Sequence, residues 1–188
     1  MKLLGSVAAL LLVGSLSSVA LAGTADQLAI ANPALKGKTA LKVSSPAFAA
    51  GAAIPEDFSA YGKNGSPPLR WGKGPYGTRS FALVLEDPDA PMASPFVHWI
   101  TWNIPAGATA FDAGQTPPGA VQGKMGAGRL GYFGPRPPAG PAHHYHFQVF
   151  ALDQTPGLTS DADLKALETA MAGHVLASGE LVATYQKK

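Results

Sequence analysis

The sequence predicts a mostly β protein: a two-sheet antiparallel sandwich of Greek-key type with one or two short helices. Three observations support this prediction: three apolar segments with strand composition, Pro- and Gly-rich stretches between them, and a single segment with clear helical spacing. The 188 residues include 22 Gly and 17 Pro, an enrichment that suits a turn-rich β protein.

The first 22 residues are expected to be a secretory signal peptide that is cleaved. Lys2 supplies a positive start, residues 7–13 are a short apolar run, and Ala20-Leu21-Ala22 is a small-x-small cleavage site. An uncleaved membrane anchor is the alternative, which the glycines and serines of the leader disfavour. Export would place the mature protein in the periplasm or outside the cell.

Residues 23–188 are expected to form one domain without stable membrane insertion once mature. The Ala-rich segment from Gly23 to about Lys38 lacks a strong period and is interpreted as a partly mobile N-terminus. The composition is nearly neutral, with Lys+Arg at 14 against Asp+Glu at 12 and no block of like charge, so nucleic acid is an unlikely class of partner. With no Cys, packing and backbone pairing alone must stabilise the fold.

Three segments predict the main strands. Residues 80–86 are a short apolar run that ends at Asp87-Pro88-Asp89-Ala90-Pro91, where the prolines cannot donate to a ladder. The second segment, residues 96–104, is rich in aromatic and β-branched residues, and the third is residues 144–153. The first strand should therefore deliver two carboxylates to the edge of the sheet.

A period of two assigns the side chains of these strands to opposite faces. In the second strand, one face is expected to hold Phe96, His98, Ile100, Trp102 and Ile104, and the other Val97, Trp99, Thr101 and Asn103. In the third strand, Tyr145, Phe147, Val149 and Ala151 should share a face with His143, opposite His144, His146, Gln148, Phe150 and Leu152.

The remaining elements are weaker. Ser160 to Asp163 suggests a helix start, and Leu164, Leu167 and Met171 follow at helical spacing before a stop at Gly173. Residues 181–185 are expected to form the last strand, which follows residues 178–180. Residues 41–43 and 47–48 are possible short strands, and residues 64–71 are interpreted as a proline-fixed loop with Arg70 paired to an acid.

Four segments have compositions that folding alone does not demand. They are residues 64–71 (NGSPPLRW), 87–91 (DPDAP), 97–99 (VHW) and 134–145 (GPRPPAGPAHHY). In this order they resemble the phosphatidylethanolamine-binding protein family, which includes the Raf kinase inhibitor proteins, and its bacterial members most closely. The resemblance extends from about Leu41 to Tyr185 and implies a two-sheet β fold with a small pocket for phosphate, acetate or a phosphorylated head group.

The resemblance also implies which residues form the pocket. Asp87 and Asp89 match the acidic pair of the family's pocket loop, while His98 and His143 match its two histidines. The tyrosine two places after the second histidine is Tyr145, and the rim loop would contain Pro137, Pro138 and Gly140. His144 stands where better-known members have an arginine.

The chemistry of these residues is compatible with a binding pocket. Imidazole N–H groups can donate to an anion's oxygens, and a carboxylate can orient a ring or receive an ammonium group. The simpler alternatives are that the two aspartates cap a turn and that His98 is a satisfied core residue.

The sequence therefore predicts a non-catalytic, exported protein that binds a small anion or phosphorylated head group without a cofactor or metal. An inhibitor or interaction protein that regulates a secreted or periplasmic protease or hydrolase through the same pocket is the alternative. A zinc-assisted hydrolase using His98, His143 and Asp87 is a weaker third hypothesis. The sequence lacks a His-Glu-x-x-His helix motif and a Gly-x-Ser-x-Gly elbow.

Overall fold

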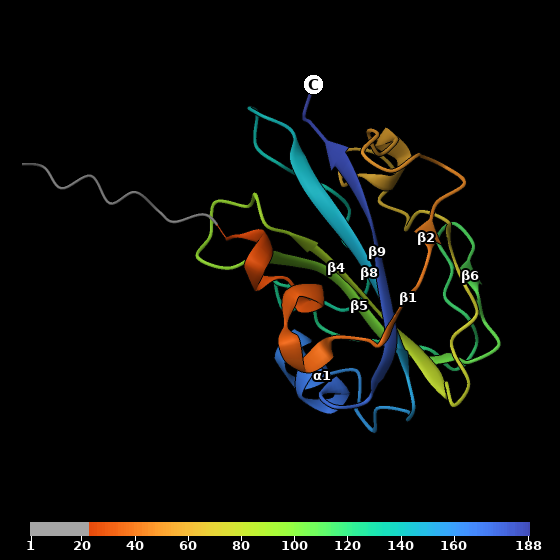
Figure 1. Cartoon of the computed structure of the whole chain (residues 1–188). Helices are drawn as coiled ribbons and strands as arrows, with labels where there is room; N and C mark the ends of the chain where they lie inside the picture. Colours follow the sequence, from red (N-terminus) through yellow and green to blue (C-terminus); the bar gives the residue numbers. More distant parts are fainter. Residues whose placement is uncertain (1–22) are drawn as a thin grey trace, which may run out of the picture.

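A computed structural model describes residues 23–188, so the predicted signal peptide lies outside the described residues. The expected mostly β, two-sheet architecture is confirmed (Figure 1). The large sheet has the strand order β1-β9-β8-β4-β5-β7, and the small sheet has the order β2-β3-β6. Every pairing is antiparallel except that of β1 with β9, which is parallel.

The bounds of the elements follow the chain. The strands are β1 (Thr39–Ala40), β2 (Val43–Ser44), β3 (Leu69–Trp71), β4 (Ser80–Asp87), β5 (Phe96–Pro105), β6 (Ala110–Phe111), β7 (Val121–Gln122), β8 (His143–Leu152) and β9 (Val175–Tyr185). The helices are the short 3-10 turns η1 (Ala25–Gln27), η2 (Ala29–Ala31), η3 (Pro33–Leu35) and η4 (Glu56–Phe58), and α1 (Leu164–Met171).

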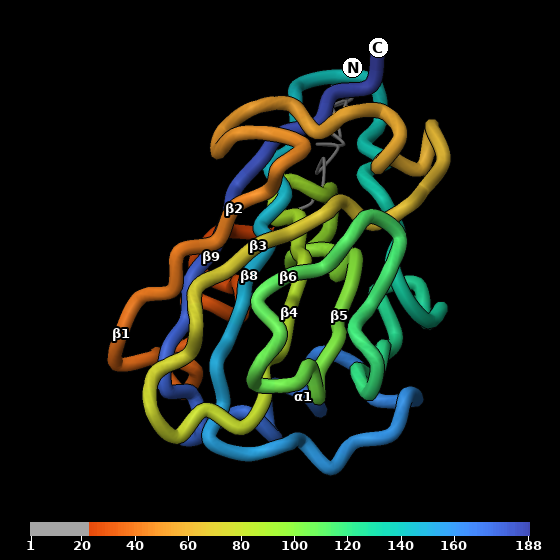
Figure 2. Tube along the Cα trace, turned by 90° about the vertical axis from the view of Figure 1, so that its right-hand side faces the viewer, coloured from red at the N-terminus to blue at the C-terminus, as the bar shows by residue number. Residues whose placement is uncertain are grey.

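The three main predicted strands are present as β4, β5 and β8, side by side in the middle of the large sheet (Figure 2). All eight residues of β4 are buried, as expected for a continuous apolar strand covered on both faces. The segment from residue 64 to 71 is not only a loop, because Leu69–Trp71 pairs between β2 and β6. Of the weaker candidates, residues 47–48 form no strand.

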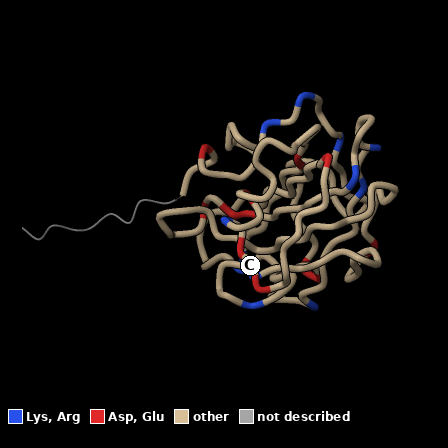
Figure 3. Tube along the Cα trace, turned by 90° about the horizontal axis from the view of Figure 1, so that it is seen from below, with Lys and Arg blue, Asp and Glu red and all other residues tan. Residues whose placement is uncertain are grey.

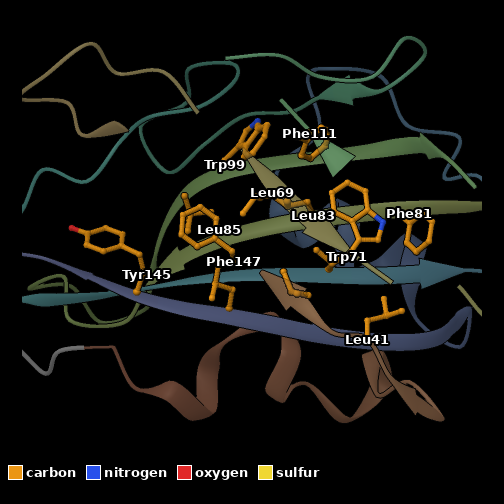
Figure 4. Close-up of a cluster of buried hydrophobic side chains, with 14 of the residues drawn as sticks. Leu41, Leu69, Trp71, Phe81, Leu83, Leu85, Trp99, Phe111, Tyr145 and Phe147 are labelled. Atoms are coloured by element: carbon orange, nitrogen blue, oxygen red, sulfur yellow. The ribbon is translucent and has the colours of Figure 1, made fainter. Parts of the chain in front are cut away.

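One large core lies between the two sheets. Figure 4 shows Phe81, Leu83 and Leu85 of β4 among this cluster, together with Trp99 of β5 and Phe147 of β8. Trp71 and Phe111 come from the small sheet and meet edge to face, with ring centroids 5.2 Å apart. Across the sheets, the Trp71 ring meets that of Phe81 with centroids 5.8 Å apart, and the Phe111 ring meets that of Trp99 at 5.3 Å, so aromatic packing holds the two sheets together.

The strict alternation predicted for β5 is wrong at both ends of the strand. Near its start, Val97 packs on the outer face with Ile100, and not with Trp99, while His98 meets Tyr145 on the side between the sheets. Ile104 packs between the sheets with Trp99, and not on the opposite face with Ile100 and Trp102. The pairing of β4 with β5 shifts register between Phe81 and Leu83, and Asn103 in the partner strand has a φ of 55°. A bulge adds one residue to a strand and so reverses the faces that follow it.

The alternation predicted for β8 is confirmed. Tyr145, Phe147, Val149 and Ala151 lie in the core between the sheets. Phe150 and Leu152 lie on the outer face of the large sheet. No bulge interrupts the pairing of β8 with β4, so a period of two holds from end to end.

The outer face of the large sheet is covered by α1 and by the N-terminal strap, residues 23–36, which appear below the sheet in Figure 1. The interpretation of this segment as a mobile terminus is wrong. Ala29 and Leu35 are fully buried in the second apolar cluster. The Ala29 and Ile30 amides donate to the side chains of Glu86 and Gln148, at 2.9 and 2.6 Å, so polar groups of the sheet also fix the strap.

The last strand is longer than predicted. It already begins at Val175, so residues 178–180 belong to β9, and Gly179 allows a close approach of two backbones. A Cβ at this glycine would lie 1.9 Å from the Leu41 carbonyl oxygen, so no larger residue fits. Residues 178–180 are therefore part of a packed strand, although their composition is typical of a connection.

The one α-helix of residues 23–188, α1, begins later than expected. Its N-cap is Asp163, whose side chain accepts a hydrogen bond from the Ala166 amide, and Ser160 lies in the preceding turn. Leu167 and Met171 are buried as predicted, and Gly173 follows the helix with a φ of 78°.

Candidate functional site

A pocket of about 520 Å³ opens where β4 ends and β8 begins. It is lined by Tyr61, Asp87, Ala90, Pro91, Met92, Phe96, His98, Phe133, Arg136, Pro137, Pro138 and His143. These residues come from two neighbouring strands, from β5, and from the loops at the same end of the large sheet (Figure 2). Five of the eight predicted site residues therefore lie around one cavity: Asp87, His98, Pro137, Pro138 and His143.

The antiparallel arrangement explains why these residues meet. Asp87 is the last residue of β4, His143 is the first of β8, and these strands are neighbours. His98 lies near the start of β5, beside a second register shift, between Leu85 and Glu86 of β4. Bulges of this kind commonly re-aim a side chain next to a binding site.

Asp87 and His143 form the polar floor of the pocket. The His143 Nδ1–H group donates to Asp87 Oδ2 at 2.8 Å, and the Asp89 amide donates to Asp87 Oδ1 at 2.8 Å. Both side chains are almost entirely buried. The carboxylate is thus held by a donor on each oxygen, and it fixes the orientation of the imidazole.

His98 presents an acceptor to the pocket. Its Nδ1 lies 2.7 Å from the Phe133 carbonyl oxygen, which can only accept, so Nδ1 carries the proton and Nε2 is a lone pair in the neutral ring. Nε2 lies 3.9 Å from Asp87 Oδ2. Burial lowers the pKa of His98 to about 4, so the ring is neutral at physiological pH.

Tyr145 is buried behind this floor and does not line the pocket. Its ring meets the His98 ring edge to face, with centroids 5.2 Å apart. Its hydroxyl has no partner with hydrogen-bond geometry among the described residues. Burial, followed by the nearby Asp87 charge, raises the pKa of Tyr145, so the phenol stays protonated and buttresses His98.

Asp89 and Gly140 also lie outside the lining. Asp89 accepts from both the backbone N–H and Nδ1 of His144, at 2.7 Å each. Burial opposes ionisation here, but these bonds lower the pKa of Asp89 overall. His144, which stands where better-known members of the resembled family have an arginine, is therefore hydrogen-bonded to Asp89 at the surface, and the Gly140 carbonyl accepts from Gln186.

Sequence reasoning missed the apolar wall and the one arginine of the pocket. Arg136 lies within the segment 134–145 that carried the resemblance, but no role was predicted for it. Tyr61 donates its hydroxyl to the Pro137 carbonyl at 2.7 Å, which ties the loop after η4 to the rim. Met92 and Phe133 complete the apolar wall of the pocket. Neither residue lies in a sequence pattern that would have predicted this position.

Charge elsewhere is dispersed. Figure 3 shows Lys and Arg positions and Asp and Glu positions spread along the chain, without a segment of one sign. Within residues 23–188, no three His, Asp or Glu side chains are placed to hold a metal ion. The same part of the chain contains no helix with the length and apolar character of a membrane span.

Comparisons with known proteins agree with this fold. The family model described as phosphatidylethanolamine-binding protein matches residues 44–186. A UPF0098 protein of Pyrococcus horikoshii is 43% identical over 159 residues, which cover 80% of this chain and 79% of that one. A Mycobacterium tuberculosis protein, named as a candidate lipoprotein, LppC, is 42% identical over 151 residues, 78% of this chain and 72% of that one.

Two solved structures are similar. A phosphatidylethanolamine-binding protein homologue of Chlamydia trachomatis superposes with a TM-score of 0.75 at 35% identity, over 80% of this chain and all of that one. The YbcL protein of E. coli, described as a member of the mammalian family, gives a TM-score of 0.74 at 32% identity, over 79% of this chain and 99% of that one. The N-terminal strap precedes the region matched by the family model.

Proposed function

Because the chain belongs to the phosphatidylethanolamine-binding protein family, we propose that it is a non-catalytic protein that binds a small oxyanion or phosphorylated head group in this pocket. A fold hosts many functions, so the proposal depends on the site. The observation that carries it is the convergence of two imidazoles and a guanidinium on one preformed cavity.

The polar groups suit an oxyanion at one side of the cavity. Arg136 offers several N–H donors in a planar fork, a geometry that matches carboxylate and phosphate oxygens. His143, oriented through Nδ1 by Asp87, adds a donor at Nε2 whenever the ring is protonated. Arg136 is exposed, so an anion can reach it without rearrangement of the core.

The shape of the cavity suits a ligand larger than a bare ion. Its volume of about 520 Å³ lies within the usual range for small-molecule sites. Three prolines, Pro91, Pro137 and Pro138, form part of the wall, and they have little conformational freedom to lose on binding. A head group carrying an organic substituent therefore has room beside the polar floor.

The chemistry of the lining supports binding more than catalysis. Among the residues that the structure describes, the lining holds no Ser, Thr or Lys to act as a nucleophile, and the sequence has no Cys. The hydroxyl of Tyr61 is engaged with a backbone carbonyl. An Asp–His pair in a lining without a side-chain nucleophile is suited to orienting a ligand and not to forming a covalent intermediate on a hydroxyl or thiol.

Export is part of the proposal. It is supported by the charge, apolar run and small-residue site of residues 1–22, and by the candidate lipoprotein among the relatives. The periplasm or the cell exterior is then the place where the ligand is met.

The test is calorimetric titration of the purified protein with inorganic phosphate and with phosphoethanolamine. Arg136→Gln should weaken both by about tenfold or more, because a charge-assisted hydrogen bond is lost. Arg79→Gln is the matched control, since Arg79 precedes β4 at the end of that strand opposite Asp87. The control should bind as the unsubstituted protein does.

Absence of binding up to millimolar ligand, in folded protein, would reject this function and direct the search to protein partners. Equal affinities in Arg136→Gln and Arg79→Gln would show that any binding occurs elsewhere. Thermal denaturation of each variant should be measured first, so that loss of binding is not confused with loss of fold.

A further inference from the structure

The floor of the pocket is rich in acceptors, which is unusual for a site that takes an anion. In the neutral state His98 offers a lone pair at Nε2, because its Nδ1 proton is committed to the Phe133 carbonyl. Asp87 offers carboxylate oxygens only 3.9 Å away. A fully ionised anion placed against these two groups would bring oxygen lone pairs into contact with lone pairs and negative charge.

The neighbours of His98 do not remove this conflict. The titratable groups near it are Asp87 from β4 and His143 and Tyr145 from β8, and Arg136 lines the same pocket. His143 already directs its Nδ1 proton to Asp87. The Phe133 ring stacks on His98 with an interplanar angle of 7°, so the imidazole cannot turn freely to exchange its ring nitrogens.

We propose that the pocket selects oxyanions that carry a proton, such as a monoprotonated phosphate, over fully ionised anions of the same shape, such as sulfate. This inference rests on the function proposed above, and it specifies the protonation state of the bound oxyanion. The ligand's own P–OH donates to Asp87 or to His98 Nε2, while its unprotonated oxygens accept from Arg136. Asp87 thereby acts as a specificity residue for the protonation state of the ligand.

Phosphate and sulfate are close in size, but at neutral pH phosphate carries at least one proton and sulfate carries none. Calorimetric titration at neutral pH should therefore give at least about tenfold tighter binding of inorganic phosphate than of sulfate, since a charge-assisted hydrogen bond is replaced by a repulsive contact. Asp87→Asn should reduce this ratio toward one, because the amide supplies a donor where the carboxylate had none.

The structure provides a matched control for this substitution. Asp153 accepts from His174 Nδ1 at 2.8 Å, the same distance as between Asp87 and His143, but it follows β8 at the end opposite the pocket. Asp153→Asn therefore removes an equivalent carboxylate–imidazole pair and should leave the phosphate-to-sulfate ratio unchanged.

A pH series tests the same proposal without any substitution. A phosphomonoester loses its second proton at a pH of about 6, whereas inorganic phosphate retains at least one proton at pH 8. Phosphoethanolamine affinity should therefore fall between pH 6 and 8 relative to that of inorganic phosphate. A change in the protein's own groups acts on both ligands, so the ratio of the two affinities isolates the proton on the ligand.

The outcomes separate the two proposals. If sulfate binds as tightly as phosphate and the two phosphate ligands keep a constant ratio from pH 6 to 8, the selection of a proton is wrong but the anion pocket stands. If neither anion binds the folded protein, the function itself fails and this inference fails with it. A ratio above tenfold that persists in Asp87→Asn would also overturn the role given to Asp87.

Discussion

Glu86 should be essential for holding the N-terminal strap on the sheet. It lies on the outer side of β4 and is 2% exposed. Its Oε2 accepts from the Ala29 amide at 2.9 Å and from Gln148 Nε2 at 2.8 Å. The perturbation is Glu86→Leu, which introduces an apolar side chain of similar size and removes the acceptor of two buried donors.

The magnitude follows from those two donors. Leaving a buried donor without a partner costs about 1–3 kcal/mol, so both together would cost roughly 2–6 kcal/mol. The strap can avoid the penalty by detaching, but then it exposes Leu35, whose burial stabilises the fold by about 1.5–3 kcal/mol. We therefore expect Glu86→Leu to lower the free energy of unfolding by about 2–4 kcal/mol.

Glu86→Gln is the matched control because its amide oxygen can still accept from both donors. It also tests the charge. Burial raises the pKa of Glu86, so the folded state holds this proton more tightly than the unfolded chain. Its ionisation therefore makes the fold less stable as pH rises above the ordinary value of 4.5, and the stability of Glu86→Gln relative to the wild type should increase from pH 4.5 to 7.

The assay is urea denaturation of the three proteins, combined with hydrogen exchange at the Ala29 and Ile30 amides. Faster exchange at these amides in Glu86→Leu, without change in the central strands, would locate the loss at the strap. The reasoning is refuted if Glu86→Leu unfolds at the same urea concentration as the wild type and both amides keep their protection.

Four further outcomes are expected from the same structure. Asp163→Ala should cost about 1 kcal/mol in urea denaturation, because the Ala166 amide loses its cap, and an unchanged midpoint would contradict this. Leu167→Ala should cost about 2–5 kcal/mol by the same measurement, since its side chain is fully buried against the sheet; a loss below 1 kcal/mol would mean that the helix is loosely packed. The depressed pKa of His98, about 4 in the fold against 6.5 ordinarily, contributes a loss of stability as pH falls from about 6.5 to 4, so His98→Gln should flatten thermal denaturation midpoints across that window. NMR of the His98 ring should show no titration between pH 5 and 8, and a midpoint near 6.5 would show that the ring is not buried in the way that lowers its pKa.

The sequence by itself determined the central strands. The apolar runs and their flanking prolines located β4, β5 and β8, and strict alternation assigned both faces of β8. These signals are local, because a period of two and a missing N–H are properties of the residues themselves. The same motifs pointed to Asp87, His98 and His143, which the structure brings to one cavity.

Other features were decided only by contacts between distant residues. The strap has no period that marks it as packed, and it is held by Glu86 and Gln148, which lie 57 and 118 residues further along the chain. The bulge at Asn103 placed Ile104 on the opposite face, a change that alternation cannot register. In the sequence, Arg136 is only a charged residue in a proline-rich segment, and its position in the pocket lining is known from the fold alone.

The state of the pocket is likewise a tertiary property. That His98 is an acceptor, and not the anion donor its residue type suggests, follows from a carbonyl 35 residues away and from burial of the ring. Residue types fix which hydrogen bonds are possible, whereas the fold fixes which are already used. The sequence thus determined the chemical groups of this site, and only the tertiary structure decided which of their protons and lone pairs remain for a ligand.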